Sequence, residues 1–316
     1  MNTSIQIHSI RGLALAAAVV VALPLGAAGA QQRSRFRTGD YPSRIDTTVA
    51  FDAHGTVNLS APSGDIHVRG SSDGKLHVHA ESEDNNLRFD LTGGHATLEI
   101  AGMSRNGDSK FEVDVPTGAR IIARTQSGDI DIRGTRGEVE AHTQNGDITI
   151  DGVTTRLDVN TFSGDVDIAN VAGDVEISTI NGDVKANELR GDVDVTAVSG
   201  DIELRAVTAK VVRAKTTSGD VTYDGAIDPN GRYELSSHSG DLRLHVPRDA
   251  SAQLSISTWN GAVDSDFPIT LKPGEHGIGI SNAKSFTFQI GGGAAHISAD
   301  TFSGDISISS NGRGAR

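Results

Sequence analysis

A glycine-aspartate pair recurs at a fixed interval between Ile121 and Tyr223, and this period restricts the possible folds more than any other feature. Successive glycines of the pair are 18 residues apart four times and 19 residues apart once. Such self-similarity is typical of a solenoid, in which each unit buries its apolar side chains against its neighbours. The repeated turns are Ser127-Gly128-Asp129, Asn145-Gly146-Asp147, Ser163-Gly164-Asp165, Asn181-Gly182-Asp183, Ser199-Gly200-Asp201 and Ser218-Gly219-Asp220.

Apolar residues alternate with polar ones after each turn. The residues two and four positions beyond the glycine are apolar, as at Ile130 and Ile132, and the second half of each unit alternates similarly, as at Leu157 and Val159. A period of two predicts strands. The sequence therefore predicts an all-β, single-domain β-solenoid with about 18 residues and two short strands per coil. A sandwich of hairpins is the competing fold.

The regular repeats lie within a longer predicted domain, residues 45–310, with irregular capping coils at both ends. Residues 1–30 contain a short apolar run and end in Ala-Gly-Ala, which predicts a cleaved secretory signal peptide. Residues 31–44 are predicted to be a flexible basic linker, and residues 311–316 a disordered tail. We expect an exported protein of the periplasm, cell surface or extracellular space, without a transmembrane segment in the mature chain.

Composition narrows the possible partners. The formal net charge is −13, so the chain is expected to bind no nucleic acid. It contains no cysteine, so it can form neither a disulfide nor a thiolate metal site. Only 4% of its residues are aromatic, which is little for an ordinary globular core. A solenoid does not need such a core.

The order of the motifs resembles a known family. The stretch Phe111 to Ala119 reads FEVDVPTGA, serial Ser/Asn-Gly-Asp turns follow it, and LHVPRDA at Leu244 to Ala250 precedes a closing Ser-Gly-Asp-Ile. In this arrangement, residues 45 to 310 resemble the bacterial "putative adhesin" β-strand-repeat family, a domain of unknown function. The resemblance implies a β-solenoid of the cell envelope. It supplies no catalytic residue.

One aspartate follows each turn glycine, and a stack of coils would align these carboxylates in a column. Hard cations such as Ca²⁺ bind carboxylate and carbonyl oxygens, so the column could be a cation site. Alternatively, each aspartate could cap its own turn through backbone N–H groups. We favour capping, because calcium-binding nine-residue repeats carry more glycines than these turns. The column comprises Asp129, Asp147, Asp165, Asp183, Asp201 and Asp220.

Three other sets of residues are candidate sites. Threonines recur three residues before the turn glycine, for example Thr143 and Thr161, and their strand phase places them inward or at the corner rather than on an ice-binding face. His77 and His79 share one strand face and could bind a transition metal with a third ligand such as His67, although a solvated pair is the simpler interpretation. The outward carboxylates that a sugar-cleaving β-helix would require are Asp131, Asp167 and Glu203.

These carboxylates alternate with uncharged or basic positions, so a soluble mixed-charge face is the simpler interpretation. The sequence thus predicts no catalytic residue, cofactor or metal ligand. We expect a structural or interaction module of the bacterial envelope that binds a protein or polysaccharide through flat acidic β faces. A carbohydrate-active β-helix enzyme and a Ca²⁺-stabilised binding module are the alternatives.

Overall fold

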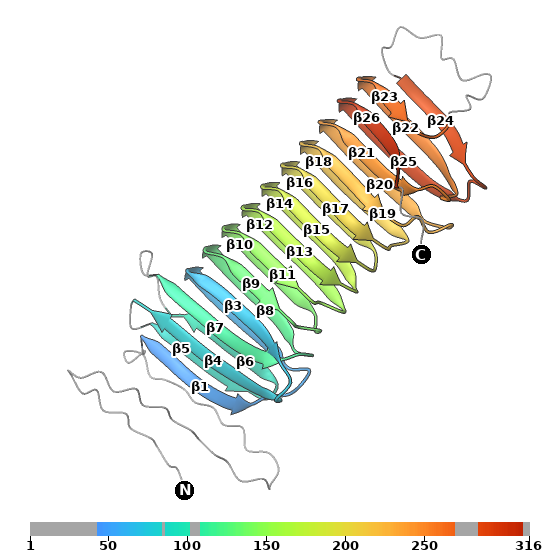
Figure 1. The fold of residues 1–316 in the computed structure, drawn as a ribbon. Helices are drawn as coiled ribbons and strands as arrows, with labels where there is room; N and C mark the ends of the chain where they lie inside the picture. Colours follow the sequence, from blue (N-terminus) through green and yellow to red (C-terminus); the bar gives the residue numbers. More distant parts are fainter. Residues whose placement is uncertain (1–42, 84–85, 102–107, 269–283, 312–316) are drawn as a thin grey trace, which may run out of the picture.

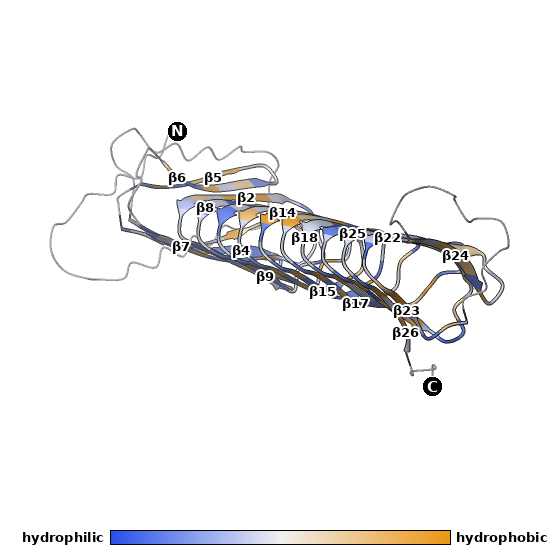
Figure 2. Ribbon diagram, turned by 90° about the horizontal axis from the view of Figure 1, so that it is seen from above, coloured by the Kyte–Doolittle hydropathy of each residue, from blue (hydrophilic) through white to orange (hydrophobic). Residues whose placement is uncertain are grey.

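The chain winds between two long β-sheets that face each other. A computed structural model describes residues 43–83, 86–101, 108–268 and 284–311, and Figure 1 shows the strands stacked along one axis. Seen from above, the two sheets form two layers with the connecting turns at either side (Figure 2). Each sheet has 13 strands. The predicted all-β solenoid is therefore confirmed, and the sandwich of hairpins is wrong.

The strands of the two sheets, in spatial order, have the following bounds. The sheet that we call A contains β1 (Arg44–Ala50), β4 (Lys75–Ser82), β7 (Ser109–Pro116), β3 (Asp65–Ser71), β9 (Ile130–Arg133), β11 (Ile148–Asp151), β13 (Val166–Val171), β15 (Val184–Leu189), β17 (Ile202–Val207), β19 (Val221–Gly225), β21 (Leu242–Pro247), β26 (Ile306–Asn311) and β23 (Val263–Ser265). Sheet B contains β5 (Leu87–Thr92), β6 (His95–Ile100), β2 (Thr56–Ser63), β8 (Arg120–Ser127), β10 (Val139–Asn145), β12 (Arg156–Ser163), β14 (Asp174–Asn181), β16 (Val193–Ser199), β18 (Val211–Ser218), β20 (Arg232–Ser239), β25 (Ala295–Ser303), β22 (Ala252–Asn260) and β24 (Lys284–Ile290).

In the regular region each coil contributes one strand to each sheet, and like residues pair between coils. Ile148 of β11 lies beside Ile130 of β9 and Val166 of β13, all in parallel register. Because side chains alternate across a strand, this register places every apolar column between the sheets. The exposed area of the inward residues Ile130, Ile148 and Val166 is at most 1%. Stacking of these columns forms the core without a large aromatic centre.

Glycine is required at the turn because consecutive coils approach closely there. The φ angle of Gly164 is +141°, which L-residues rarely adopt. A Cβ atom added to Gly164 would lie 2.0 Å from the carbonyl oxygen of Gly146 in the preceding coil. The recurrent glycine thus meets both a conformational and a steric requirement.

The C-terminal coils stack in an order that differs from their order in the chain. The last coil, β25–β26, lies between β20–β21 and β22–β23, where β25 pairs with both β20 and β22. The turn glycines are correspondingly ordered Gly240, Gly304, Gly261 along the stack. The order differs from that in the sequence, where the turns at Gly240, Gly261 and Gly304 follow one another and would be expected to form successive coils.

The N-terminal end is also rearranged. The coil β6–β7 packs outside β2–β3, and β4 and β5 run antiparallel to β7 and β6 beyond it. Irregular capping coils at both ends were predicted, and the antiparallel strands β1, β4, β5 and β24 confirm them.

Several predicted segments lie outside the described residues. These are the signal peptide (1–30), nearly all of the linker (31–44) and the tail from residue 312 onward. Among the residues that the structure describes, no helix is long and apolar enough to cross a membrane.

Candidate interaction surface

The column of turn aspartates forms a hydrogen-bond ladder between coils. The backbone N–H of Asp183 donates to Oδ1 of Asp165 at 2.9 Å, and the N–H of Asp165 donates to Oδ1 of Asp147 at 2.8 Å. The same bond recurs from Asp65 at the N-terminal end to Asp305, whose Oδ1 accepts from the N–H of Ala262. We predicted that each aspartate caps its own turn, and this is wrong: each one caps the turn of the next coil.

The aspartates reach the next turn because consecutive coils are close together. Parallel strands lie about 4.8 Å apart, so the amide of the next turn is within reach of a short carboxylate side chain. The ladder occupies one oxygen of each carboxylate. Among the described residues, no group of three or more histidine, aspartate or glutamate side chains could hold a metal ion.

The threonine column lies inside the corner, as predicted. The hydroxyl of Thr216 donates to the carbonyl oxygen of Gly200 at 3.1 Å, and that of Thr301 donates to the oxygen of Gly240 at 3.1 Å. Thr161 and Thr179 are equally buried, but their hydroxyls have no hydrogen-bond partner among the described residues. The column therefore faces the core and offers no outward rank of hydroxyl groups.

Next to this buried column, an apolar row runs along the outside of the same corner. We call it the corner stripe: the outward residues two positions before the turn glycines. The stripe contains the only large apolar side chains of the described residues that are substantially exposed: Phe162 (54%), Ile180 (40%), Val198 (45%), Phe302 (49%) and Trp259 (42%). The apolar members form two groups, Phe162 to Val198 and Phe302 with Trp259, and the strands that carry Thr217 and His238 lie between them. Exposed apolar side chains on adjacent strands are unusual on a soluble surface.

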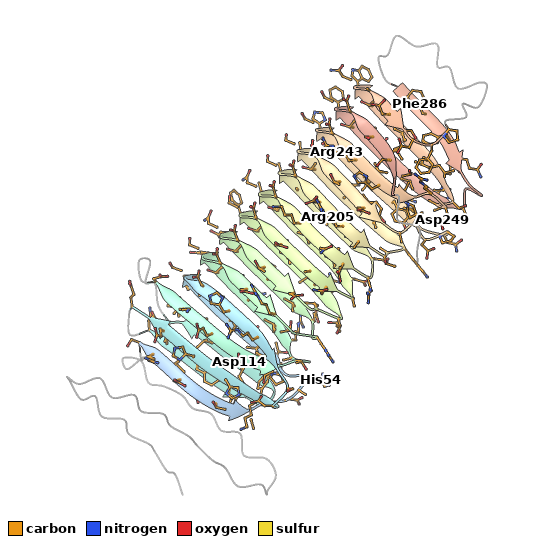
Figure 3. All side chains as sticks on the ribbon, in the orientation of Figure 1. His54, Asp114, Arg205, Arg243, Asp249 and Phe286 are labelled. Atoms are coloured by element: carbon orange, nitrogen blue, oxygen red, sulfur yellow. The ribbon has the colours of Figure 1, made fainter. Side chains whose placement is uncertain are left out.

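Aromatic rings stack at the C-terminal part of the corner stripe. The ring of Phe302 lies 4.9 Å from that of His238 with an interplanar angle of 12°. On its other side it lies 6.0 Å from the Trp259 ring at 10°. The three rings come from the neighbouring strands β20, β25 and β22, so the out-of-order insertion of β25 brings them together. Figure 3 shows side chains projecting along both edges of the stack.

The outer face of sheet B carries a row of acidic residues beside the corner stripe. Glu140, Asp158, Glu176 and Asp194 occupy the same register on four adjacent strands. Arginines partly compensate them: Arg156 contacts Glu176 at 2.7 Å and Arg213 contacts Asp194 at 2.7 Å.

Glu140 has basic neighbours that stabilise its ionised form. Burial raises the pKa of Glu140. A hydrogen bond with His142 and the positive charges of Arg124 and Arg120 lower it by more than burial raises it, so the pKa lies below its ordinary value. The neighbouring histidine and arginines thus stabilise the ionised form of Glu140.

Within the part of the chain that the structure describes, His67, His77 and His79 do not group as metal ligands. His79 and His67 lie on β4 and β3, which flank β7, and Glu112 of β7 separates them in register. His77 lies near Asp73, with Nε2 2.6 Å from Oδ2, and this hydrogen bond lowers the pKa of Asp73 to about 2. The simpler interpretation from the sequence is a solvated pair. The side chains of His77 and His79 are 36% and 33% exposed, and each also contacts an acidic neighbour.

The three carboxylates that are candidates for sugar cleavage lie on the outer face of sheet A. Asp131, Asp167 and Glu203 are on alternate strands, with Thr149 and Lys185 on the strands between them. Two hollows of the described surface measure about 380 and 260 Å³, and both lie over sheet B. Neither is lined by any of these three carboxylates. The geometry therefore does not bring two of them together in a cleft.

Sequence reasoning missed the corner stripe, although its signal was present. Phe162, Ile180 and Val198 occupy an outward phase of the alternation, where polar residues are expected. Apolar residues at this outward position in three successive coils indicate a surface that is not selected for solubility alone.

The chain was compared with protein families and with solved structures. A family model described as Toastrack DUF4097 matches residues 56–309. Among solved structures, a "putative adhesin" from Bacteroides fragilis is 15% identical, with 85% of this chain and 98% of that chain covered and a TM-score of 0.43. One from Parabacteroides merdae is 13% identical, with 65% and 90% covered and a TM-score of 0.44. No curated protein matches the chain.

A third solved structure carries a different description. It is a "putative lipid binding protein" from Parabacteroides distasonis, 9% identical, with 87% of this chain and 98% of that chain covered and a TM-score of 0.44.

Proposed function

The chain belongs to the Toastrack DUF4097 family, and from this premise we propose that it is an exported, non-enzymatic scaffold that binds another envelope protein through the corner stripe and the acidic face beside it. The resemblance to a β-strand-repeat family of unknown function, expected from the motifs, is confirmed by this membership. The observation that carries the proposal is the row of exposed apolar side chains on one straight edge.

The apolar part of the surface supplies affinity. Phe162, Ile180 and Val198 lie on β12, β14 and β16, three adjacent strands of sheet B. Covering apolar area contributes roughly 25 cal/mol per Å², and aromatic side chains commonly dominate such contacts. An extended segment of a partner could lie along the row and contact several coils at once.

The charge beside the corner stripe specifies the partner. The aspartate ladder borders the row on one side. On the other side the acidic residues of sheet B lie four positions earlier on the same strands, and a row of neutral polar residues, Asn160, Ser178 and Thr196, separates them from the stripe. A chain with a net charge of −13 repels anionic surfaces and attracts cationic ones. We therefore infer that the partner is a polypeptide segment that combines basic and apolar residues.

Site-specific photo-crosslinking in the native cell tests this proposal. A photoreactive phenylalanine analogue replaces Phe162 or Val198 on the corner stripe, and Lys185 on sheet A serves as the matched control position. We expect one discrete crosslinked polypeptide from the two stripe positions and none from the control. Once identified by mass spectrometry, that polypeptide is purified and its affinity is measured by titration calorimetry.

The affinity measurement separates the possible outcomes. The triple substitution Phe162→Ser, Ile180→Ser and Val198→Ser should weaken binding at least tenfold, and added salt should weaken it further because the partner is basic. An equal yield at Lys185, or no effect of the triple substitution, would reject the corner stripe as the binding surface. Retention by immobilised neutral glycan instead of protein would favour the polysaccharide alternative.

A further inference from the structure

The two ends of the solenoid are offset by one strand, in opposite sheets. At the N-terminal end, β1 extends sheet A one strand beyond the level of the β4–β5 coil. At the C-terminal end, β24 extends sheet B one strand beyond the β22–β23 coil. These steps complement each other in shape. If the C-terminal end of one molecule met the N-terminal end of another, β24 would lie beside β5 and β1 beside β23.

Strand direction supports this contact. In sheet B, β24 runs antiparallel to β22 and β5 runs antiparallel to β6, whereas all strands from β6 to β22 are parallel, so β24 and β5 point the same way. In sheet A, two successive antiparallel pairings, β1 with β4 and β4 with β7, give β1 the direction of β23. Both new pairs would therefore be parallel, as the pairs of the regular coils are.

The side chains at both ends are unusually apolar for capping elements. At the N-terminal end, Ile45, Val49, Phe89 and Leu91 pack against the core but are only half-buried. At the C-terminal end the same holds for Val263, Phe267 and Phe286, and Figure 3 shows Phe286 on the terminal strand. Natural solenoids normally shield their ends with polar capping units.

The facing strands also match in pattern. The inward residues of β5 are Leu87, Phe89 and Leu91, and those of β24 are Phe286, Phe288 and Ile290. On the outward side, Arg88 and Asp90 of β5 would meet the neutral residues of β24, namely Ser285, Thr287 and Gln289. Apolar residues would therefore continue the core across the junction, and no like charges would oppose each other between these two strands.

We propose that copies of this chain associate head to tail, so that β24 and β23 of one copy pair with β5 and β1 of the next and continue both sheets. Among the described residues, the outer edges of these four strands pair with no other strand. Unpaired edges with apolar inward residues readily pair with another chain. Because the contact is heterologous and repeats along one axis, it produces open linear filaments instead of closed rings.

The absence of cysteine makes a disulfide test specific. The double variant Asp90→Cys with Thr287→Cys places one thiol on the outward face of each proposed partner strand. Under mild oxidation of the full chain, we expect a ladder of dimers, trimers and longer species on non-reducing gels. The control pairs Asp90→Cys with Thr196→Cys, which is exposed on β16 in the middle of the same sheet.

Mixing the single variants determines polarity. Asp90→Cys mixed with Thr287→Cys should give crosslinked dimers that neither single variant gives alone, because the contact joins unlike ends. A ladder no stronger than that of the control, or homodimers of Asp90→Cys as abundant as the mixed dimers, would overturn the proposal.

Sedimentation of the cysteine-free chain provides an independent test. Its weight-average mass should rise with concentration, and Phe286→Lys should hold it at the monomer mass, with circular dichroism confirming the fold. A constant monomer mass of the unmodified chain up to its solubility limit would contradict head-to-tail association. If Phe286→Lys fails to fold, the cysteine ladder still decides.

Discussion

Single carboxylates join neighbouring coils in this protein. Asp165 accepts a hydrogen bond from the turn above and donates its own N–H to the turn below, so each aspartate connects three successive coils. An ordinary capping aspartate satisfies groups within its own turn. Here the short rise between parallel strands directs the same side chain to the next repeat.

Substitution of Asp165 should therefore destabilise the stack locally. Asp165→Ala leaves the N–H of Asp183 without its acceptor and should cost about 1 kcal/mol of unfolding free energy. Asp165→Asn keeps an acceptor oxygen and should lose less than half of that. Urea denaturation measures both, with Asp167→Ala on the outer face of sheet A as the control. Equal losses for all three variants would show that the ladder does not stabilise the fold.

The pair of Asp73 and His77 should produce a measurable pH effect. The hydrogen bond from His77 lowers the pKa of Asp73 to about 2 from an ordinary value of 3.8. A depressed carboxylate pKa stabilises the folded state above pH 3.8, and this stability is lost as the pH falls toward 2.

Carboxyl-detected NMR titration checks this effect. In His77→Ala, the pKa of Asp73 should return most of the way to its ordinary value. An unchanged titration in the variant would show that His77 does not cause the shift.

Coil corners depend on glycine for two separable reasons. Gly164→Ala meets both an unfavourable φ and a contact of 2.0 Å with the Gly146 carbonyl oxygen. We expect a loss of about 2 kcal/mol or more. Gly74 has a φ of +67° but no atom within 4 Å of an added Cβ, so Gly74→Ala should cost about 1 kcal/mol from conformation alone. Chemical denaturation of both variants measures the two losses. The difference between them contains the close contact and the less favourable φ of Gly164, and equal costs would contradict the close approach.

Along the threonine column, the same substitution should have opposite consequences in different coils. Thr216→Val removes a hydrogen bond to the Gly200 oxygen and should cost about 1 kcal/mol. Thr161→Val removes a buried hydroxyl with no described partner and should be neutral or stabilising. The melting temperatures of the two variants distinguish these results. A clear loss for Thr161→Val would mean that its hydroxyl forms a bond in solution.

Sequence alone could predict the regular coils because each repeat carries its own turn and its own alternation. It could not predict the order of the end coils. The turns at Gly240 and Gly304 both read Ser-Gly-Asp, and the turn at Gly261 differs in having Asn260 and Ala262 in place of the serine and the aspartate. These differences do not specify which coil lies next to which, and parallel columns of β-branched residues accept any coil as a neighbour. The correct order depends on which pairs of strands fit best at the end of the stack, and this information is distributed over β20, β22 and β25.

The candidate surface was predictable only in part. Acidic outer faces follow from charge and strand phase, but the partner of each turn aspartate depends on the distance between coils. The corner stripe could have been found by comparing outward positions between repeats, where Phe162, Ile180 and Val198 replace the glutamines of earlier coils, Gln126 and Gln144.

Over its full length the solenoid should unfold from its ends. Each regular coil contacts only its two neighbours, so a terminal coil has half the contacts of an internal one. At concentrations low enough to keep the chain monomeric, we expect amide hydrogen exchange to be slowest in β12 to β17 and fastest in β1 and β24. Mass spectrometry of exchanged peptides measures this gradient. Uniform protection along the chain would indicate that the stack opens as one cooperative unit, or that its ends are covered by other copies.

The position of β25–β26 also determines when the molecule can be completed. β22–β23 and β24 emerge earlier in synthesis than the coil that joins them to the rest of the stack, because β25 alone pairs β22 to β20. Until the last described residues have been synthesised, the preceding segment has no native neighbour on its inner side. The C-terminal part of this repeat protein therefore cannot fold coil by coil as it is synthesised. A chain truncated before Ala295 would lack the last coil, and the segment from β22 through β24 would no longer be attached to β20.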